Sequence, residues 1–113
     1  MSKHVIHFLG PVNVISIQNL RNIILQSING QKPASEIELL ISSEGGDLNS
    51  GFTAYNFIRS IQIPITCINI GTVESMAVIL YLAGDQRLAV QHSRFLLHSL
   101  HWGFNAGNVD QNR

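Results

Sequence analysis

The chain carries little charge of either sign. Its 113 residues include seven basic and seven acidic side chains, so the formal net charge is zero. This balance provides no basic surface of the kind that attracts nucleic acid or an anionic membrane, and neither partner is expected. Hydrophobic residues make up 45% of the chain and charged residues only 12%. Part of the apolar surface is therefore expected to be covered by other subunits, as in a homo-oligomer.

Cysteine and lysine are equally scarce. The single cysteine, Cys67, excludes an internal disulfide and is predicted to be a small buried residue of a strand. The only lysines, Lys3 and Lys32, lie near the terminus and in a turn, which argues against a serine–lysine dyad. No histidine pair has metal-ligand spacing with a carboxylate, so neither a metal nor a cofactor is expected.

Long hydrophobic runs are missing as well. The N-terminal apolar run is interrupted by a histidine and is too short for a signal peptide. The apolar run at residues 61–70 is far below the length that spans a membrane. A cytoplasmic location is therefore expected.

Strand and helix patterns alternate along the rest of the chain. This order predicts an α/β fold in a single domain, residues 1–113, built from stacked β-α-β units with a mostly parallel sheet. Strands are expected at residues 5–9, 37–41, 65–70, 87–90 and 95–98, and helices at residues 15–28, 49–61 and 75–83.

Three short stretches carry candidate chemistry. The pair Gly45-Gly46 follows a strand, Ser75 begins a helix, and His98 ends a later strand. Taken singly, the glycines could form only a tight turn, Ser75 could be a helix cap, and His98 could be a strand residue. Strand-to-helix turns of a parallel sheet lie at one edge, however, and there the three residue types favour serine acyl transfer. The sequence around Ser75 is not the Gly-x-Ser-x-Gly elbow of α/β-hydrolases.

At this point the sequence resembles the proteolytic subunit of the Clp protease, a serine peptidase with a crotonase-like fold. The likeness runs from about Val5 to Trp102. It includes residues 8–12 (Phe-Leu-Gly-Pro-Val), residues 93–98 (Ser-Arg-Phe-Leu-Leu-His), and the ungapped separation from the glycine pair to the serine.

The resemblance implies a role for four residues. Ser75 corresponds to the nucleophile and His98 to the general base, while Gly46 and Met76 correspond to the residues whose amides form the oxyanion hole. It also implies an endopeptidase that hydrolyses unfolded proteins or peptides inside a ring-shaped homo-oligomer, with an ATPase unfoldase as its partner.

The chain also departs from this family. Glu44 stands where proline is usual, Glu74 stands where a small residue is usual, and a hairpin expected between Gly84 and Ser93 is two residues shorter. Because Glu74 has no cationic neighbour in the local sequence, its carboxylate is expected either to oppose the developing oxyanion or to face solvent. In the first case Glu74→Ala would raise the rate.

The acid of the triad is the missing element. The family's aspartate and ring-docking helix lie further along than this chain runs, so the domain is expected to be truncated at its C-terminal end. The internal alternative is Asp110, twelve residues after His98. Two other functions stay open: a non-catalytic subunit of the same fold, and a crotonase-type acyl-CoA enzyme. A crotonase-type enzyme does not need a serine at the start of a helix paired with a histidine on a strand, so this pair argues against it.

Overall fold

A computed structural model describes residues 2–97 of the chain. His98, the last residue of the fifth predicted strand, and Asp110 lie outside the described residues. The predicted order of strands and helices is confirmed, with small shifts at the ends. The elements are β1 (Lys3–Leu9), α1 (Val14–Asn29), β2 (Glu36–Ser43), α2 (Leu48–Ser60), β3 (Ile65–Glu74), α3 (Met76–Leu82), β4 (Gln86–Ala89) and β5 (Arg94–Leu96).

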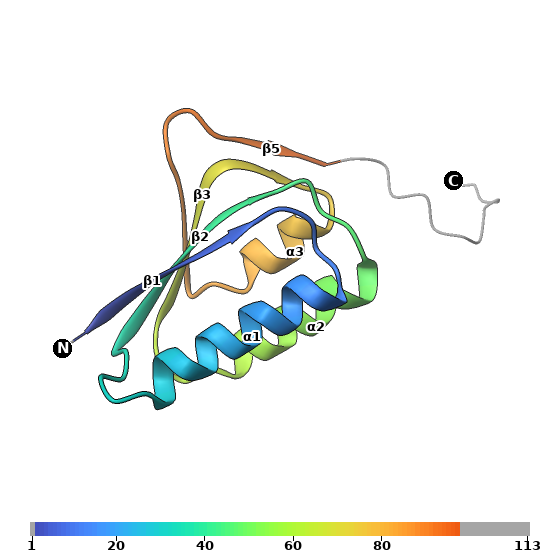
Figure 1. Cartoon of the computed structure of the whole chain (residues 1–113). Coiled ribbons are helices and arrows are strands. Elements are labelled where there is room, and N and C mark those ends of the chain that lie inside the picture. Colours follow the sequence, from blue (N-terminus) through green and yellow to red (C-terminus); the bar gives the residue numbers. More distant parts are fainter. Residues whose placement is uncertain (1, 98–113) are drawn as a thin grey trace.

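The strands form one parallel sheet. Its order is β1-β2-β3-β4, and β5 also pairs with β3. Every described pair of strands is parallel, as the repeated β-α-β order predicts. Figure 1 shows α1, α2 and α3 on the same side of this sheet. Within residues 2–97, no helix is long and apolar enough to cross a membrane.

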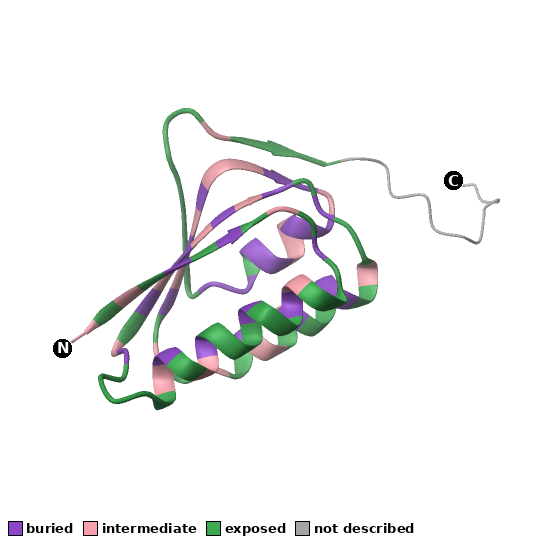
Figure 2. Ribbon diagram, in the orientation of Figure 1, coloured by how far each residue is buried: buried purple, intermediate pink, exposed green. Residues whose placement is uncertain are grey.

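The core lies between the sheet and the three helices. Along β2, residues with buried side chains alternate with half-buried or exposed ones, and Figure 2 shows the same alternation on the neighbouring strands. Leu39 and Ile41 of β2 and Leu80 of α3 are fully buried in this layer. Cys67 is also fully buried, as predicted.

The opposite face of the sheet is more open. His7, Leu40, Ile68 and Leu88 lie in register across four strands on this face. Leu88 is exposed, Leu40 and Ile68 are half-buried, and no described helix lies over this side in Figure 1. Parallel sheets usually have both faces covered. The described part of the chain therefore leaves apolar sheet surface uncovered.

The expected hairpin between Gly84 and Ser93 is not present. β4 pairs with residues 66–69 of β3 and β5 pairs with residues 72–74, both in parallel, so the two strands follow one another along the same edge of β3. Asn69 joins them, because its carbonyl accepts the Val90 N–H (3.0 Å) and its side-chain Nδ2 donates to the Arg94 carbonyl (2.8 Å). The turn between the two strands is therefore a bulge in one edge rather than a reversal.

The pairing of β2 with β3 is irregular near the carboxyl end of β3, where β3 bends. Ile41 pairs with Asn69 and Ser43 with Val73, so two steps along β2 match four along β3. The Thr72 N–H donates to Ser42 Oγ (3.2 Å) inside this irregularity. Figure 1 shows β3 curving before it enters α3. This curvature sets the direction of the turn that carries Ser75.

Candidate active site

Ser75 occupies a strained turn between β3 and α3. Its backbone has φ 54° and ψ −125°, and it is the one non-glycine residue with positive φ among residues 2–97. Such conformations cost roughly 1–3 kcal/mol and concentrate at functional sites. Ser75 stands at the N-cap position of α3, but its hydroxyl makes no capping hydrogen bond. The alternative role of Ser75 as a simple side-chain cap is therefore not supported.

The glycine pair lies directly against this turn. Gly45 has φ +96°, and a Cβ atom placed on it would lie 2.9 Å from the Ser75 Cβ and 3.0 Å from the Met76 N. Only a residue without a side chain fits there. The structure therefore brings the predicted glycine turn, Ser75 and Met76 together.

Backbone hydrogen bonds hold the glycine turn in place. The Val12 N–H donates to the Gly45 carbonyl (2.9 Å), and the Asp47 N–H donates to the Val12 carbonyl (2.8 Å). A Cβ atom on Gly46, which has φ +152°, would overlap that same Val12 carbonyl. Asp47 then caps α2. Its carboxylate accepts hydrogen bonds from the Ser50 hydroxyl and the Ser50 N–H, and these bonds lower the pKa of the carboxyl. The glycine turn is therefore held by Val12 on one side and by the start of α2 on the other.

Two backbone N–H groups beside Ser75 have no hydrogen-bond partner in the described structure. The Gly46 N–H donates to no group of residues 2–97. Met76 is the first residue of α3, where a backbone N–H has no partner within the helix. Free donors of this kind can stabilise a developing oxyanion.

Glu74 does not lie as expected. Its side chain is only 8% exposed, so it does not face solvent. The Thr72 hydroxyl donates to Glu74 Oε2 (2.6 Å), and the Arg94 guanidinium lies 3.4 Å from the same oxygen. The expectation that Glu74 faces solvent was wrong, and its cation comes from β5, twenty residues further along the chain, rather than from the local sequence.

His98 lies outside the described residues, but the strand that leads to it is described. β5 pairs with the last three residues of β3, and the Ser75 N–H donates to the Leu96 carbonyl (3.1 Å). Tyr81 of α3 contacts the ring of Phe95 edge-on, with centroids 5.1 Å apart. The chain therefore passes beside Ser75 two residues before it reaches His98.

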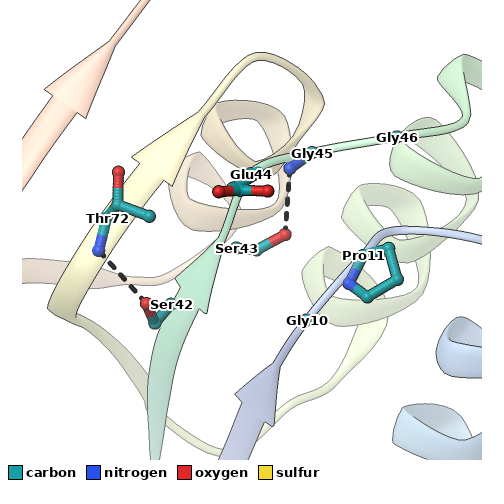
Figure 3. Close-up of a pocket in the computed structure, with 8 residues that line it drawn as sticks. All are labelled: Gly10, Pro11, Ser42, Ser43, Glu44, Gly45, Gly46 and Thr72. Carbon is teal, nitrogen blue, oxygen red and sulfur yellow. Dashed lines mark hydrogen bonds between the residues drawn. The ribbon is translucent and has the colours of Figure 1, made fainter.

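A cleft of about 610 Å³ opens beside the glycine turn, at the carboxyl ends of β1 and β2. Figure 3 shows its lining, which consists of Gly10, Pro11, Ser42, Ser43, Glu44, Gly45, Gly46 and Thr72. The Gly45 N–H donates to Ser43 Oγ (3.1 Å) across its wall. Ser75 is not part of this lining, so the cleft adjoins the Ser75 turn through the glycine pair.

Cys67 is not an alternative nucleophile. It is fully buried, and this burial raises the pKa of its thiol to about 12. A thiol with so high a pKa carries almost no thiolate at neutral pH. Among residues 2–97, no group of three or more histidine, cysteine or acidic side chains could hold a metal ion.

Sequence reasoning missed three residues that shape the site. Asn69, Thr72 and Arg94 bind the end of β3 to β5 through side-chain hydrogen bonds. Of the three, Asn69 could have been identified from the sequence, since an amide inside an apolar strand must find hydrogen-bond partners when it is buried.

Comparison with known proteins agrees with this geometry. The family model described as Clp protease matches residues 1–111. The chain is 33% identical over 85 residues to the ATP-dependent Clp protease proteolytic subunit of Deinococcus radiodurans, a match that covers 74% of this chain and 42% of that protein. It is 32% identical over 90 residues to the ATP-dependent Clp protease proteolytic subunit 2 of Borreliella burgdorferi, covering 78% and 44%. The chain thus spans less than half the length of these relatives.

Solved structures show the same fold. The ClpP protease catalytic domain from Plasmodium falciparum superposes with a TM-score of 0.75 at 25% identity, covering 83% of this chain and 54% of that one. ClpP1 from Listeria monocytogenes superposes with a TM-score of 0.74 at 22% identity, covering 86% and 57%.

Proposed function

The chain belongs to the Clp protease family, and on this premise we propose that it is a serine endopeptidase in which Ser75 is the nucleophile and His98 the general base. The observation that carries the proposal is the strained Ser75 turn, whose hydroxyl does no capping and which packs against the glycine pair. Strain held by surrounding contacts is typical of a residue placed for chemistry.

Peptide hydrolysis at this site proceeds in two halves. His98 takes the hydroxyl proton of Ser75 as Oγ attacks the carbonyl carbon, and it then gives that proton to the leaving amine as the C–N bond breaks. A water molecule, deprotonated by His98, attacks the resulting ester, and the proton returns to Ser75 Oγ as the acid product leaves. No redox step or cofactor is involved.

The path of β5 supports the role of His98. Leu96 is hydrogen-bonded to the Ser75 N–H (3.1 Å), and two residues further along an extended chain lie within about 7 Å. This chain length permits the proposed role of His98. The acid that orients His98 is not assigned to a residue of this chain.

The Gly46 and Met76 N–H groups form the oxyanion hole in this proposal. Met76 follows Ser75 in the chain, Gly46 follows the Gly45 that packs against Ser75, and neither N–H has a partner in the described part of the chain. The N-terminal end of α3 adds the positive end of a helix dipole, although a helix this short contributes little. Loss of one oxyanion donor typically costs roughly 3 kcal/mol of transition-state stabilisation.

The working form is a homo-oligomeric ring that hydrolyses unfolded proteins or peptides, with an ATPase unfoldase as partner. The apolar sheet face that the described chain leaves uncovered and the low proportion of charged residues support association with further chains. A buried, unpaired thiol fits a reducing cytoplasm.

Kinetics on a fluorogenic peptide test the assignment. Ser75→Ala and His98→Ala should each remove nearly all turnover, and the double variant should be no worse than either, because such residues act as a unit. Ser60→Ala, at the exposed end of α2, is the matched control and should retain full turnover. Undiminished hydrolysis by the Ser75→Ala protein would refute the proposal, and an unmodified protein without any turnover would favour a non-catalytic subunit.

A further inference from the structure

The carboxylate of Glu74 is buried directly before the nucleophile turn. Its side chain is 8% exposed, and Oε2 accepts the Thr72 hydroxyl proton at 2.6 Å. A buried carboxylate is costly unless it is hydrogen-bonded and paired with a cation. A glutamate one residue before a reactive serine therefore requires a hydrogen-bond donor and a cation close to its carboxylate.

Arg94 supplies that arrangement from the neighbouring strand. Its Nη2 lies 3.4 Å from Glu74 Oε2, and its Nε donates to Thr72 Oγ1 at 3.3 Å. The backbone carbonyl of Arg94 accepts a hydrogen bond from the buried Asn69 side chain. Thr72, Glu74 and Arg94 thus form a polar cluster, here called the Glu74 cluster, that joins the end of β3 to the start of β5.

Strand β5 has few other means of holding its register. It is three residues long, every residue in it is exposed, and it pairs with β3 only through residues 72–74. Outside the Glu74 cluster, the described contacts that hold it are the Asn69 bond, the Phe95–Tyr81 ring contact and the Leu96 carbonyl bonded to Ser75. Because Phe95 and Leu96 remain 48% and 39% exposed, burial supplies only part of what holds so short a strand, and its polar contacts supply the rest.

We propose that Glu74 and Arg94 are positioning residues that lock β5 against the nucleophile turn, so that Ser75 keeps its strained conformation and β5 delivers the chain toward the site in one register. This inference rests on the proposed peptidase function for its kinetic consequence. Its structural consequence concerns the Ser75–Leu96 hydrogen bond alone and can be measured without any activity.

The kinetic test uses Arg94→Ala in the assembled, full-length protein. Turnover should fall about tenfold or more, since small misplacements of reacting groups are costly, while KM should stay within about twofold because neither Glu74 nor Arg94 lines the cleft beside the glycine turn. The guanidinium of Arg94 is 70% exposed, so added guanidinium ion at low millimolar concentration should restore part of the lost kcat. Methylammonium, which lacks the planar fork, should not.

Two control variants separate positioning from general destabilisation. Arg87→Ala removes an arginine from the same sheet edge. Within residues 2–97 the Arg87 guanidinium donates only to the Gly84 and Leu82 carbonyls, and the kcat of this variant should be unchanged. In the Glu74→Gln/Arg94→Ala double variant the carboxylate is gone, so guanidinium should restore nothing. Rescue that persists in the double variant, or an Arg94→Ala kcat within twofold of the unmodified protein, would overturn the inference.

Amide hydrogen exchange distinguishes failure of this inference from failure of the proposed function. The Ser75 N–H should exchange at least about tenfold faster in Arg94→Ala than in Arg87→Ala, because its bond to Leu96 opens more often. If the unmodified protein hydrolyses no peptide but the two variants still differ in exchange, the peptidase assignment fails and the positioning role stands. Equal exchange in the two variants would contradict the positioning role whatever the activity.

Discussion

Gly45 and Ser75 are in such close contact that a methyl group on Gly45 would lie 2.9 Å from the Ser75 Cβ. The same methyl group would lie 2.8 Å from the Glu74 carbonyl oxygen. These positions are thirty residues apart in sequence and belong to two different strand-to-helix turns. The glycine turn and the Ser75 turn therefore pack directly against each other.

Gly45→Ala should therefore inactivate the protein. The added methyl group must push the Ser75 turn away, and a displacement near 1 Å at reacting groups can lower turnover by about a hundredfold. The measurement is kcat on a fluorogenic peptide, together with urea unfolding to confirm that the variant is folded.

Gly10→Ala is the matched control for that substitution. Gly10 also has a positive φ, +105°, but a Cβ atom there meets nothing within 4 Å. It should share the backbone strain, roughly 1–3 kcal/mol of stability, while losing much less turnover than Gly45→Ala. Equal losses in the two variants would show that strain, rather than contact with Ser75, limits the Gly45 position.

Asn69 should be essential for the edge formed by β4 and β5. Its fully buried side chain donates to the Arg94 carbonyl and accepts the Gly71 N–H. Asn69→Leu leaves both groups without this partner, and each such group costs roughly 1–3 kcal/mol. The free energy of unfolding from urea titration should fall by about 2 kcal/mol or more.

The same chemical change at Asn56 provides the comparison. Asn56 is exposed on α2, so Asn56→Leu should alter the free energy of unfolding by no more than about 0.5 kcal/mol. A similar, small effect of both substitutions would mean that Asn69 does not hold the edge together.

Cys67 should be unreactive in the folded protein. Because burial raises the pKa of its thiol to about 12, a disulfide reagent at pH 8 should modify it only after unfolding. The pKa is higher in the folded state, so this thiol's contribution to stability is complete below pH 9 and is lost as the pH rises toward 12. Cys67→Ala should weaken that alkaline loss. Fast modification of the native protein would contradict the burial of this residue.

The alternation of strands and helices could be predicted because each element has its own local period. The apolar positions of α1 recur at helical spacing, and along β2 buried residues alternate with half-buried ones. The parallel sheet then places the Gly45 and Ser75 turns at one edge. The closeness of these two turns therefore followed from topology.

The partner of Glu74 could not be predicted, because it depends on the register of a strand twenty residues away. The hairpin expected before Ser93 was wrong for a related reason. Turn-like residues indicate that the chain bends but not whether it reverses, and here the Asn69 side chain spans the bulge. Side-chain hydrogen bonds and ion pairs between strands that are distant in sequence leave little trace in the local sequence pattern.

The account depends most directly on Ser75 being the nucleophile, and labelling with a fluorophosphonate tests this. The reagent should add once per chain. Fragmentation of the tryptic peptide spanning residues 60–87 should place the adduct on Ser75 and not on Ser60, which lies in the same peptide. The Ser75→Ala protein and the urea-unfolded protein should not react, because the reagent requires an activated hydroxyl. An adduct on Ser60, or one that persists in the Ser75→Ala protein, would contradict the account.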